Sequence, residues 1–522
     1  MTGAISRAER QWALRWAVAV VALSCLPYLL AWALAPDETH YTGLLLNPLD
    51  GESYYAKMQQ GARGDWLFHL PYTPEPHEGA PVYGFYLALG HLAGLLSLPI
   101  PLVYHLARAA AGLFLLLVAY GFIAHFVERP PLRRAAFLLL AFSAGFGWLL
   151  APLGILVADL WVAEGFAFFS ILINPHFPLG IGLMLLLFLA VLTSGEGRPT
   201  ARRLAATAAG GLLLAVVHPF AVPVVLAALA VYLAVRTARE RRVPWAAALA
   251  GAALAGGAAP VVLYDLYLFR TNPALAAWSA QNVTTSLPPW NYALGYGLVL
   301  LLAIPGIVVA ARRRRSTDHF LLAWVGSAAV LLYVPFALQR RFITGLHVPL
   351  VLLAAMGLEQ VVWQRVGPRR QGLATGLLVA VASLSNVFVL LVAVAGVAAG
   401  RAPLVMTRGE AAACDWLAEN TTWTDTVLTP IESGQFIPAW AGNRVVYGHP
   451  FETIDAKAKQ EQVSHFYSPA ATTAERRELL DRYQVRYLLI LGEADKVDVA
   501  ALGLVRAWTS DGAALYRVEA GQ

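Results

Sequence analysis

Long apolar stretches separated by short polar ones dominate the first 400 residues and predict a bundle of membrane-spanning helices. A spanning helix needs about 20 mostly apolar residues, because it rises about 1.5 Å per residue. About eleven stretches meet or approach that length: residues 12–35, 102–127, 135–151, 178–194, 204–217, 219–235, 244–264, 291–311, 318–338, 342–363 and 372–398. The pattern therefore predicts an α-helical polytopic membrane protein.

Two apolar regions, one of them outside this set, depart from simple crossing. Residues 82–98 are apolar but span only about 25 Å and contain several glycines, so we expect an interfacial or re-entrant helix there. Residues 204–217 cover only about 21 Å, which places the turn at His218 below the outer membrane surface. Such a turn is tolerated only inside protein or beside a water-filled cavity, so we expect a recess that opens outward.

The pattern changes after residue 400, where helical and extended periodicities alternate. The sequence "EAAACDWLAEN" predicts a helix, "TVLTPI" a strand, and "VRYLLIL" a buried strand. Thr472 and Glu475 form a capping-box pattern ahead of "TAERRELLDRY", and "ALYRVE" is typical of an edge strand. We expect residues 1–400 to form the membrane domain and residues 401–522 a small α/β domain.

The distribution of charged residues predicts the orientation of the chain in the membrane. Of all residues 58% are hydrophobic and 13% charged, and the net charge of +6 is spread over short loops, so it does not indicate nucleic-acid binding. The positive-inside rule places the arginine clusters in the cytoplasm. These clusters are Arg7/Arg10/Arg15, Arg129/Arg133/Arg134, Arg198/Arg202/Arg203, Arg236/Arg239/Arg241/Arg242, Arg312 to Arg315 and Arg365/Arg369/Arg370.

Because all six arginine clusters lie on the cytoplasmic side, the spans between them must cross the membrane in pairs. This predicts a cytoplasmic N-terminus, a long first outer loop at residues 36–101 and an extracytoplasmic C-terminal domain. It also requires residues 82–98 not to cross. The arginine-rich, lysine-poor composition suggests a bacterial plasma (inner) membrane.

The first outer loop carries the first candidate residues. Asp50 and Glu52 lie just before Tyr54 and Tyr55. Tyrosines favour the membrane interface, and Asp50 and Tyr54 share a face if a helix begins here. The alternative is a solvated acidic loop.

The second outer loop has two acids, Asp159 and Glu164, the latter among aromatic residues. A carboxylate in such a setting is costly unless it is paired or used. His176 and His218 lie near the outer ends of the following spans. A carboxylate with histidines could bind a divalent metal, although no spacing here is diagnostic. The alternative is hydrogen-bonded histidines at helix ends.

Four further residues could bind an anion. Arg340 and Arg341 lie outside, against the charge rule, and either snorkel at the interface or bind a lipid phosphate. His105 and Arg108 lie one turn apart near the outer end of a span and could face the same recess.

Together these features resemble the GT-C glycosyltransferases, which include protein O-mannosyltransferases and the lipid A aminoarabinose transferase. An acid follows the first helix, a tyrosine pair comes next, a second acid lies in the second outer loop, and a small α/β tail follows. The tail phrases "GNRVVYGHPFET" and "ERRELLDRYQVRYLLIL" look like those of bacterial members. The family often shows an adjacent acidic pair, whereas Gly51 separates Asp50 from Glu52 here.

The resemblance implies a sugar donor on a polyprenyl phosphate and an extracytoplasmic glycan, lipid or protein acceptor. Asp50 or Glu52, with Asp159 or Glu164, would then be catalytic, and Arg340, Arg341, Arg108 and His105 would bind the donor phosphate. Tyr54, Tyr55, His176 and His218 would line the cavity. A divalent metal (Mg, Mn or Zn) could be held by Asp50, Glu164 and His176. The alternatives are a non-catalytic polyprenol-binding or assembly protein of the same fold and a lipid-linked glycan transporter.

Overall fold

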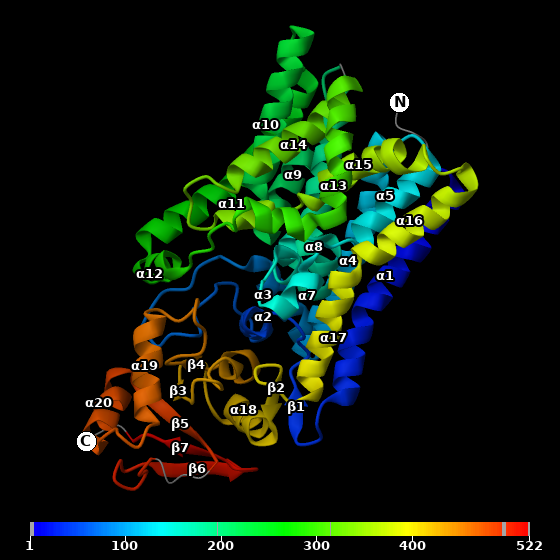
Figure 1. The fold of residues 1–522 in the computed structure, drawn as a ribbon. Coiled ribbons are helices and arrows are strands. Elements are labelled where there is room, and N and C mark those ends of the chain that lie inside the picture. Colours follow the sequence, from blue (N-terminus) through cyan, green and yellow to red (C-terminus); the bar gives the residue numbers. More distant parts are fainter. Residues whose placement is uncertain (1–4, 196, 314, 493–496, 520–522) are drawn as a thin grey trace. The chain divides into compact units, whose positions relative to one another are not determined.

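The computed structural model describes residues 5–195, 197–313, 315–492 and 497–519. These residues form two compact units (Figure 1). The first unit comprises residues 1–27, 106–264 and 284–392, and the second comprises residues 28–105, 265–283 and 393–522. The first outer loop thus belongs to the same compact unit as the C-terminal tail.

The first unit is a helical bundle. Four helices have residues in both units: α1 (Arg7–Leu34), α4 (Ile100–Phe126), α11 (Trp245–Thr271) and α17 (Leu384–Ala398). The longer helices of the bundle are α5 (Pro130–Phe142), α8 (His176–Leu192), α9 (Ala201–Val217), α10 (Ala221–Glu240), α13 (Pro289–Arg313), α14 (Ser316–Leu331), α15 (His347–Leu358) and α16 (Pro368–Ala382). Short helical segments lie between them: α6 (Gly147–Leu150), η1 (Ala151–Leu153), η2 (Ala158–Leu160), η3 (Ala163–Gly165), α7 (Ala167–Ile173), η4 (Gln339–Ile343) and η5 (Glu359–Trp363).

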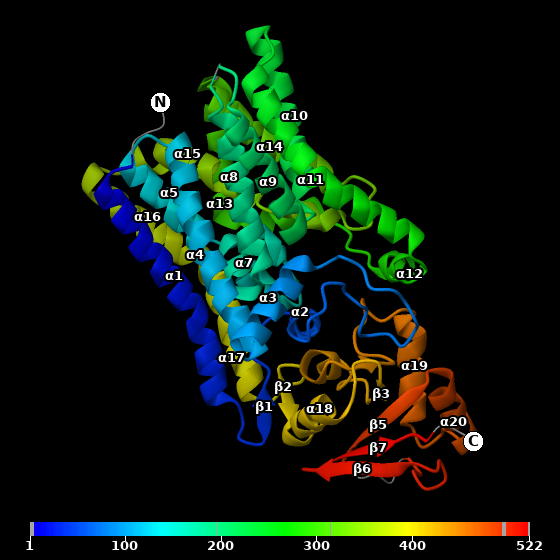
Figure 2. The same cartoon turned by 180° about the vertical axis from the view of Figure 1, so that it is seen from behind.

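Helix α15 is buried along its whole length and packs against α13 and α5. Two glycines allow α13 and α15 to approach closely. A Cβ at Gly306 would lie 1.8 Å from the carbonyl oxygen of Leu353, and one at Gly357 would lie 1.9 Å from that of Leu302. Small residues commonly bring membrane helices together in this way. Elsewhere in the bundle, α1 lies beside α4 and α5, where Trp12 contacts Tyr120 and Phe137 (Figure 2).

The helices confirm a multi-pass membrane protein. Among the described residues, eight helices are long and apolar enough to cross a membrane. The remaining three expected spans correspond to shorter helices, α8 and α9 with 17 residues each and α14 with 16. The exact number of crossings, about eleven, therefore stays a prediction. Residues 82–98 contain α3 (Gly84–Leu96), a helix of 13 residues.

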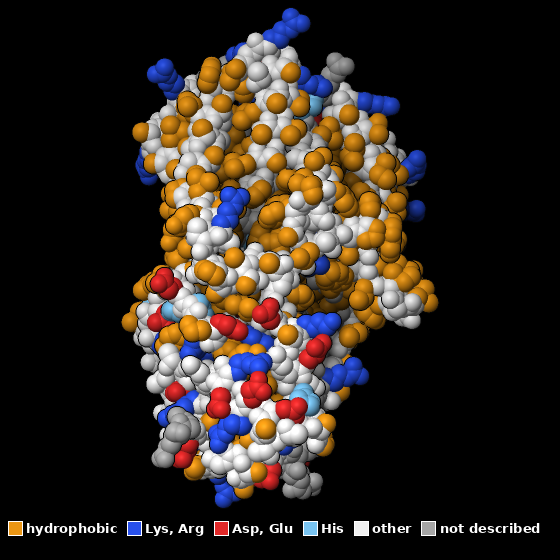
Figure 3. Space-filling model, turned by 90° about the vertical axis from the view of Figure 1, so that its left-hand side faces the viewer, with side chains coloured by type: hydrophobic (Ala, Val, Ile, Leu, Met, Phe, Trp, Pro, Cys, Tyr) orange, Lys and Arg blue, Asp and Glu red, His pale blue; other side chains and the backbone are white. Residues whose placement is uncertain are grey.

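Hydrophobic side chains cover much of the helical surface. In Figure 3 they lie over the bundle, while charged side chains gather over the C-terminal part of the chain. The exposed side chains on α9 to α11 include Leu212, Leu213, Val231, Leu249 and Leu263. In a bilayer these side chains would contact lipid, which accounts for an apolar exterior on a folded protein.

The second unit contains a five-stranded mixed sheet in the order β4-β3-β5-β7-β6. Its strands are β3 (Thr426–Leu428), β4 (Arg444–Val445), β5 (Val485–Leu491), β6 (Val505–Ser510) and β7 (Ala513–Arg517). Helix α18 (Arg408–Asn420) and the π-helical turn η6 (Ile437–Ala441) share a core with one face, and α19 (Ala456–Phe466) and α20 (Thr473–Arg482) share one with the other. The unit also holds α2 (Pro48–Ala62), α12 (Pro273–Gln281) and a ribbon of β1 (Thr39–Tyr41) with β2 (Val405–Thr407).

Most of the predicted pattern of the tail is present. The capping box of Thr472 and Glu475 begins α20, and β5 is a buried central strand. The prediction that "ALYRVE" forms an edge strand is wrong. Strand β7 pairs with β5 on one side and β6 on the other, so β6 is the edge. Leu515 belongs to the core on one face of the sheet and Tyr516 and Val518 to the core on the other, so both faces of β7 are covered.

Candidate functional site

Asp50 lies in the first turn of α2. The helix follows Asn47, whose backbone is left-handed (φ 49°), and Pro48 at its first position is preset for helical geometry. The Asn47 side-chain amide donates a hydrogen bond to Asp50 Oδ2 at 2.5 Å. A negative charge is favoured at a helix N-terminus by about 0.3–1 kcal/mol. The side chain of Asp50 is 41% exposed, so its carboxylate is both held and accessible.

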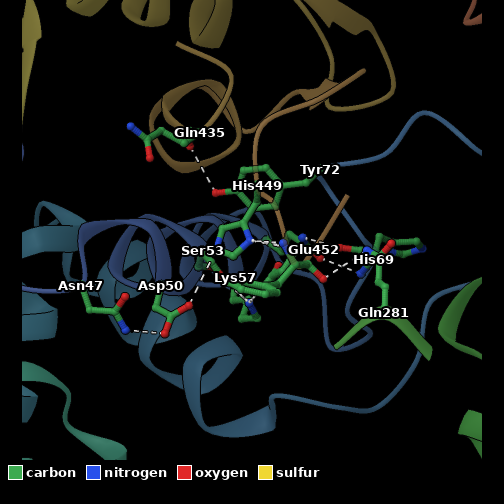
Figure 4. A network of polar contacts seen from close by, with 12 residues as sticks. Asn47, Asp50, Ser53, Lys57, His69, Tyr72, Gln281, Gln435, His449 and Glu452 are labelled. Atoms are coloured by element: carbon green, nitrogen blue, oxygen red, sulfur yellow. Dashed lines mark hydrogen bonds and ion pairs between the residues drawn. The ribbon is translucent and has the colours of Figure 1, made fainter. Parts of the chain in front are cut away.

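His449, in the C-terminal part of the chain, faces this carboxylate. Its Nε2 lies 3.7 Å from Asp50 Oδ1, and its side chain is only 1% exposed (Figure 4). The backbone N–H groups of Phe451 and Glu452 both donate to His449 Nδ1 at 3.1 Å. The imidazole is therefore fixed by its own loop and presents one nitrogen to Asp50.

A buried ion pair lies two turns further along α2 than Asp50. Lys57 Nζ is 2.8 Å from Glu452 Oε1 and also donates to Ser53 Oγ. Burial raises the pKa of Glu452, but the charges of Lys57 and His449, together with the hydrogen bonds from Lys57 and Ser53, hold this pKa below its usual value. The rings of Tyr83, Phe68 and Tyr54 surround the ammonium at 4.3, 5.2 and 5.4 Å from their centroids. This pair joins α2 to the loop that carries His449.

Glu52 has a different environment from Asp50. It is completely buried, and Trp440 Nε1 donates to its Oε2 at 3.0 Å, while Oε1 has no hydrogen-bond partner. Burial raises the pKa of Glu52 well above its usual value, and the Trp440 hydrogen bond offsets only part of this. Glu52 is thus a buried carboxyl with a raised pKa, whereas Asp50 is partly exposed.

Glu52→Gln is expected to stabilise the folded protein by an amount that grows with pH. Because its folded pKa is raised, the stability that Glu52 contributes is fully present below its unfolded pKa and is lost as pH rises towards its folded pKa. Glutamine has no such loss. Thermal unfolding in detergent at pH values from 5 upwards should show the difference in unfolding free energy growing by at most about 1.4 kcal/mol per pH unit, until the folded pKa of Glu52 is passed. A difference that does not change with pH would contradict a raised pKa of Glu52.

The tyrosines after Asp50 pack within the second unit. Tyr54 stacks on Tyr86 with ring centroids 4.3 Å apart, and Tyr55 is buried edge-on against Tyr104 at 5.2 Å. His105 Nε2 makes a 2.8 Å hydrogen bond with the carbonyl oxygen of Gly43. Tyr54 is the more accessible of the pair and lies one turn from Asp50, as the spacing predicts.

The acids of the second loop also differ from each other. Asp159 is buried, and its Oδ2 accepts hydrogen bonds from the backbone N–H groups of Gly145 and Gly147 at 2.9 and 3.1 Å. Burial raises its pKa despite these bonds. Glu164 lies in η3, and its backbone oxygen accepts from the N–H of Gly345 at 3.4 Å. The Asp159 carboxylate therefore holds the loop that contains Gly145 and Gly147. Glu164 lies where η3 packs against the end of η4.

The paired arginines lie on η4, within the first unit. The guanidinium of Arg340 is 4.4 Å from the Trp161 ring centroid, and that of Arg341 is 5.3 Å from the Phe220 ring centroid. His218 Nε2 makes a 3.1 Å hydrogen bond with Thr344 Oγ1, just after η4. The aromatic contacts hold both guanidiniums in place and add cation–π attraction.

His176 and Arg108 complete the candidates of the first unit. The ring of His176 lies 5.5 Å from that of His218. Arg108 is fully buried and donates to Ile171 O at 3.0 Å, Ser24 Oγ at 3.2 Å and Cys25 Sγ at 3.4 Å. It thereby joins α1, α4 and α7.

The described residues do not fit a metal centre. Among them, no group of three or more His, Cys, Asp or Glu side chains is placed to hold an ion. The ligand set expected from the sequence, Asp50, Glu164 and His176, draws on both units and stays a prediction.

Lys57, His449, Glu452 and Trp440 were not singled out from the sequence. The three tail residues lie 388 to 399 positions along the chain from their partners on α2, so no local pattern reveals these contacts. The one available signal was Lys57, a rare base in an outer loop.

Comparisons with known proteins identify the fold. No protein-family model matches the sequence, and no curated protein matches it significantly. Among solved structures, ArnT from Cupriavidus metallidurans in the apo state is similar with a TM-score of 0.56, 15% identity, and coverage of 96% of this chain and 97% of that one. The chain has a GT-C glycosyltransferase fold.

Other GT-C structures agree. The oligosaccharyltransferase of Archaeoglobus fulgidus, tethered with an acceptor peptide, has a TM-score of 0.52 and 17% identity over 97% of this chain and 74% of that one. The mycobacterial arabinofuranosyltransferase AftD has a TM-score of 0.50 and 15% identity, and this chain spans 40% of its length. The resemblance inferred from the sequence is thus confirmed at the level of the fold.

Proposed function

We propose that this protein is an integral membrane glycosyltransferase that moves a hexose or pentose from a polyprenyl phosphate to an extracytoplasmic glycan, lipid or protein. The observation that carries the proposal is Asp50, an exposed carboxylate fixed at the start of α2 within a GT-C fold. Similarity to ArnT bound to undecaprenyl phosphate, with a TM-score of 0.55, supports the class of donor.

Asp50 takes the role of the general base. The acceptor hydroxyl oxygen attacks the anomeric carbon, and the bond from that carbon to the phosphate oxygen breaks. The phosphate leaves with the bonding electrons, while the hydroxyl proton passes to Asp50. Glu52 does not suit this role because it is buried and its pKa is raised.

Arg340 and Arg341 take the role of donor-phosphate ligands. Guanidinium groups bind phosphate through charge-assisted hydrogen bonds, and these two are anchored on η4 by aromatic rings. Glu164 and His218 lie around the same segment and would line the site. The role of Arg108 is better assigned to packing, since its donors meet α1 and α7.

The double variant Arg340→Ala, Arg341→Ala is expected to weaken binding of undecaprenyl phosphate at least about tenfold, because a hydrogen bond to a charged group contributes about 1.5–3 kcal/mol. Binding is measured by titration of the purified protein in detergent. Arg369→Ala, at an exposed cytoplasm-facing position by the charge rule, is the matched control. Unchanged affinity in the double variant would favour snorkelling at the interface instead.

The orientation proposed is a cytoplasmic N-terminus and an extracytoplasmic C-terminal domain in the bacterial plasma membrane. The arginine clusters support it. Labelling of an introduced cysteine at exposed Lys457 from outside intact cells, but not at exposed Arg198, tests it.

The function itself is tested by mass spectrometry of a deletion strain. We expect a polyprenyl-phosphate-linked sugar to accumulate and a cell-envelope glycan, lipid or protein to lose that sugar. Wild-type protein should reverse both changes. Restoration by a chain that lacks the Asp50 carboxylate would instead indicate a non-catalytic assembly protein, and movement of the lipid-linked sugar across sealed vesicles without transfer would indicate a transporter.

A further inference from the structure

We propose that His449 is the positioning residue for Asp50, and that the C-terminal part of the chain thereby completes the base on α2. This inference rests on the proposed function for its kinetic consequence, but the contact itself is independent of it. The observation is the 3.7 Å approach of His449 Nε2 to Asp50 Oδ1 at a site where the imidazole is almost completely buried.

The loop determines which nitrogen carries the proton. His449 Nδ1 accepts two backbone N–H groups, from Phe451 and Glu452, so it holds no proton of its own. In the neutral imidazole the proton is then on Nε2, which makes no hydrogen bond in the described part of the chain. The donor thus points at Asp50, and a shift of well under 1 Å would bring the two atoms within hydrogen-bond distance.

Hydrogen bonds within the loop of residues 448–453 fix the orientation of the His449 imidazole. The Thr453 hydroxyl accepts from the N–H groups of Gly448 and His449 at 3.3 and 3.2 Å, and the N–H of Thr453 donates to the carbonyl of His449 at 3.0 Å. The Tyr72 ring packs at 5.6 Å from the imidazole. The salt bridge of Glu452 to Lys57 fastens the same loop to α2.

The charged and titratable groups that face His449 come from each neighbouring element. Asp50 approaches from α2, Glu452 from its own loop, and the Tyr72 ring from the first outer loop. Glu452 pairs with Lys57 through Oε1, and Asp50 Oδ1 is the carboxylate oxygen that lies 3.7 Å from His449 Nε2. The hydrogen bond would hold one carboxylate oxygen and orient the other lone pairs towards the acceptor hydroxyl. Catalytic hydrogen bonds of this kind are often long before substrate binds and shorten in the complex.

Two substitutions separate this role from loop support. In His449→Asn the amide oxygen replaces Nδ1 as the acceptor of the loop, but nothing replaces Nε2–H. In His449→Gln the amide nitrogen replaces Nε2–H, but the loop loses its acceptor. If His449 positions Asp50, the asparagine variant keeps wild-type thermal stability and loses activity, while the glutamine variant is less stable and retains more activity.

The kinetic arm uses the lipid-linked sugars extracted from a deletion strain as donor, with membranes of the same strain as acceptor. We expect His449→Asn to lower kcat on the order of 10- to 100-fold, the usual cost of losing a hydrogen bond that orients a site residue, with KM for the donor unchanged. Wild-type kcat in His449→Asn would overturn the proposal, and so would a raised KM with unchanged kcat.

The second arm needs no transfer activity. In the purified full chain labelled with ¹⁵N-histidine, the His449 resonances are assigned by their loss in His449→Asn. We expect Asp50→Asn to shift the Nε2 resonance and to leave Nδ1 unprotonated. An unshifted Nε2 resonance would overturn the proposal. If Asp50→Asn shifts the Nε2 resonance but the wild-type protein transfers no sugar, the contact between His449 and Asp50 is supported and the proposed function is refuted.

Discussion

Asp50→Asn is expected to lower the rate of sugar transfer about 10²- to 10⁴-fold, the range typical of losing a general base. The amide is nearly the same size as the carboxylate, and its oxygen can still accept the hydrogen bond from Asn47. It is not basic enough to take the acceptor's proton. Binding of undecaprenyl phosphate should be unchanged, because the proposed phosphate ligands lie on η4. The measurement is single-turnover transfer from lipid-linked sugars by purified protein.

Glu52→Gln is the matched control, since it makes the same chemical change two residues further along α2. It should retain activity, because Glu52 is buried and its raised pKa makes it a poor match for the role of the base. If Asp50→Asn retains activity and Glu52→Gln loses it, the base is the other carboxylate. If both variants retain activity, the start of α2 has no catalytic role.

Lys57→Met is expected to cost about 3–5 kcal/mol of folding free energy in the second unit. Removing one member of a buried ion pair leaves the other charge without compensation, and Glu452 would be buried with only Ser53 as a close partner. The loop with His449 should loosen with it. Hydrogen exchange of residues 449–453 and thermal unfolding in detergent would record both effects.

The double variant Lys57→Met, Glu452→Leu sharpens this test. Replacing both charges by apolar side chains should cost less than Lys57→Met alone, because no unpaired charge remains. Lys457→Met, at an exposed position of α19, should change the unfolding free energy by less than about 0.5 kcal/mol. A single variant as stable as the wild type would show that the pair contributes little.

Local patterns predicted the features that depend on neighbours in the sequence. The capping box of α20, the buried strand β5 and the short helix α3 all follow from spacing and residue type, whereas the sequence left open whether a helix begins at Asp50. The same patterns failed at β7, because whether a strand is an edge depends on the partner that it finds. Its partner β6 has weaker periodicity and did not stand out.

The candidate acids show the same limit more sharply. Asp50 and Glu52 are two residues apart in one polar stretch, yet one faces outward and the other is fully buried against Trp440, 388 residues later. Likewise Asp159 and Glu164 differ because the amides of Gly145 and Gly147 meet only Asp159. Burial and long-range partners decide the chemistry of each acid, and neither can be read from spacing.

The link between Lys57 and Glu452 also has a consequence for biosynthesis. The two residues are 395 positions apart, so at a translation rate of about 5–20 residues per second the ribosome makes the second on the order of 20–80 s after the first. During that interval Lys57 has no partner from the tail, and Asp50 lacks the imidazole that faces it. A nascent or truncated chain would therefore carry α2 without the contacts that the tail supplies.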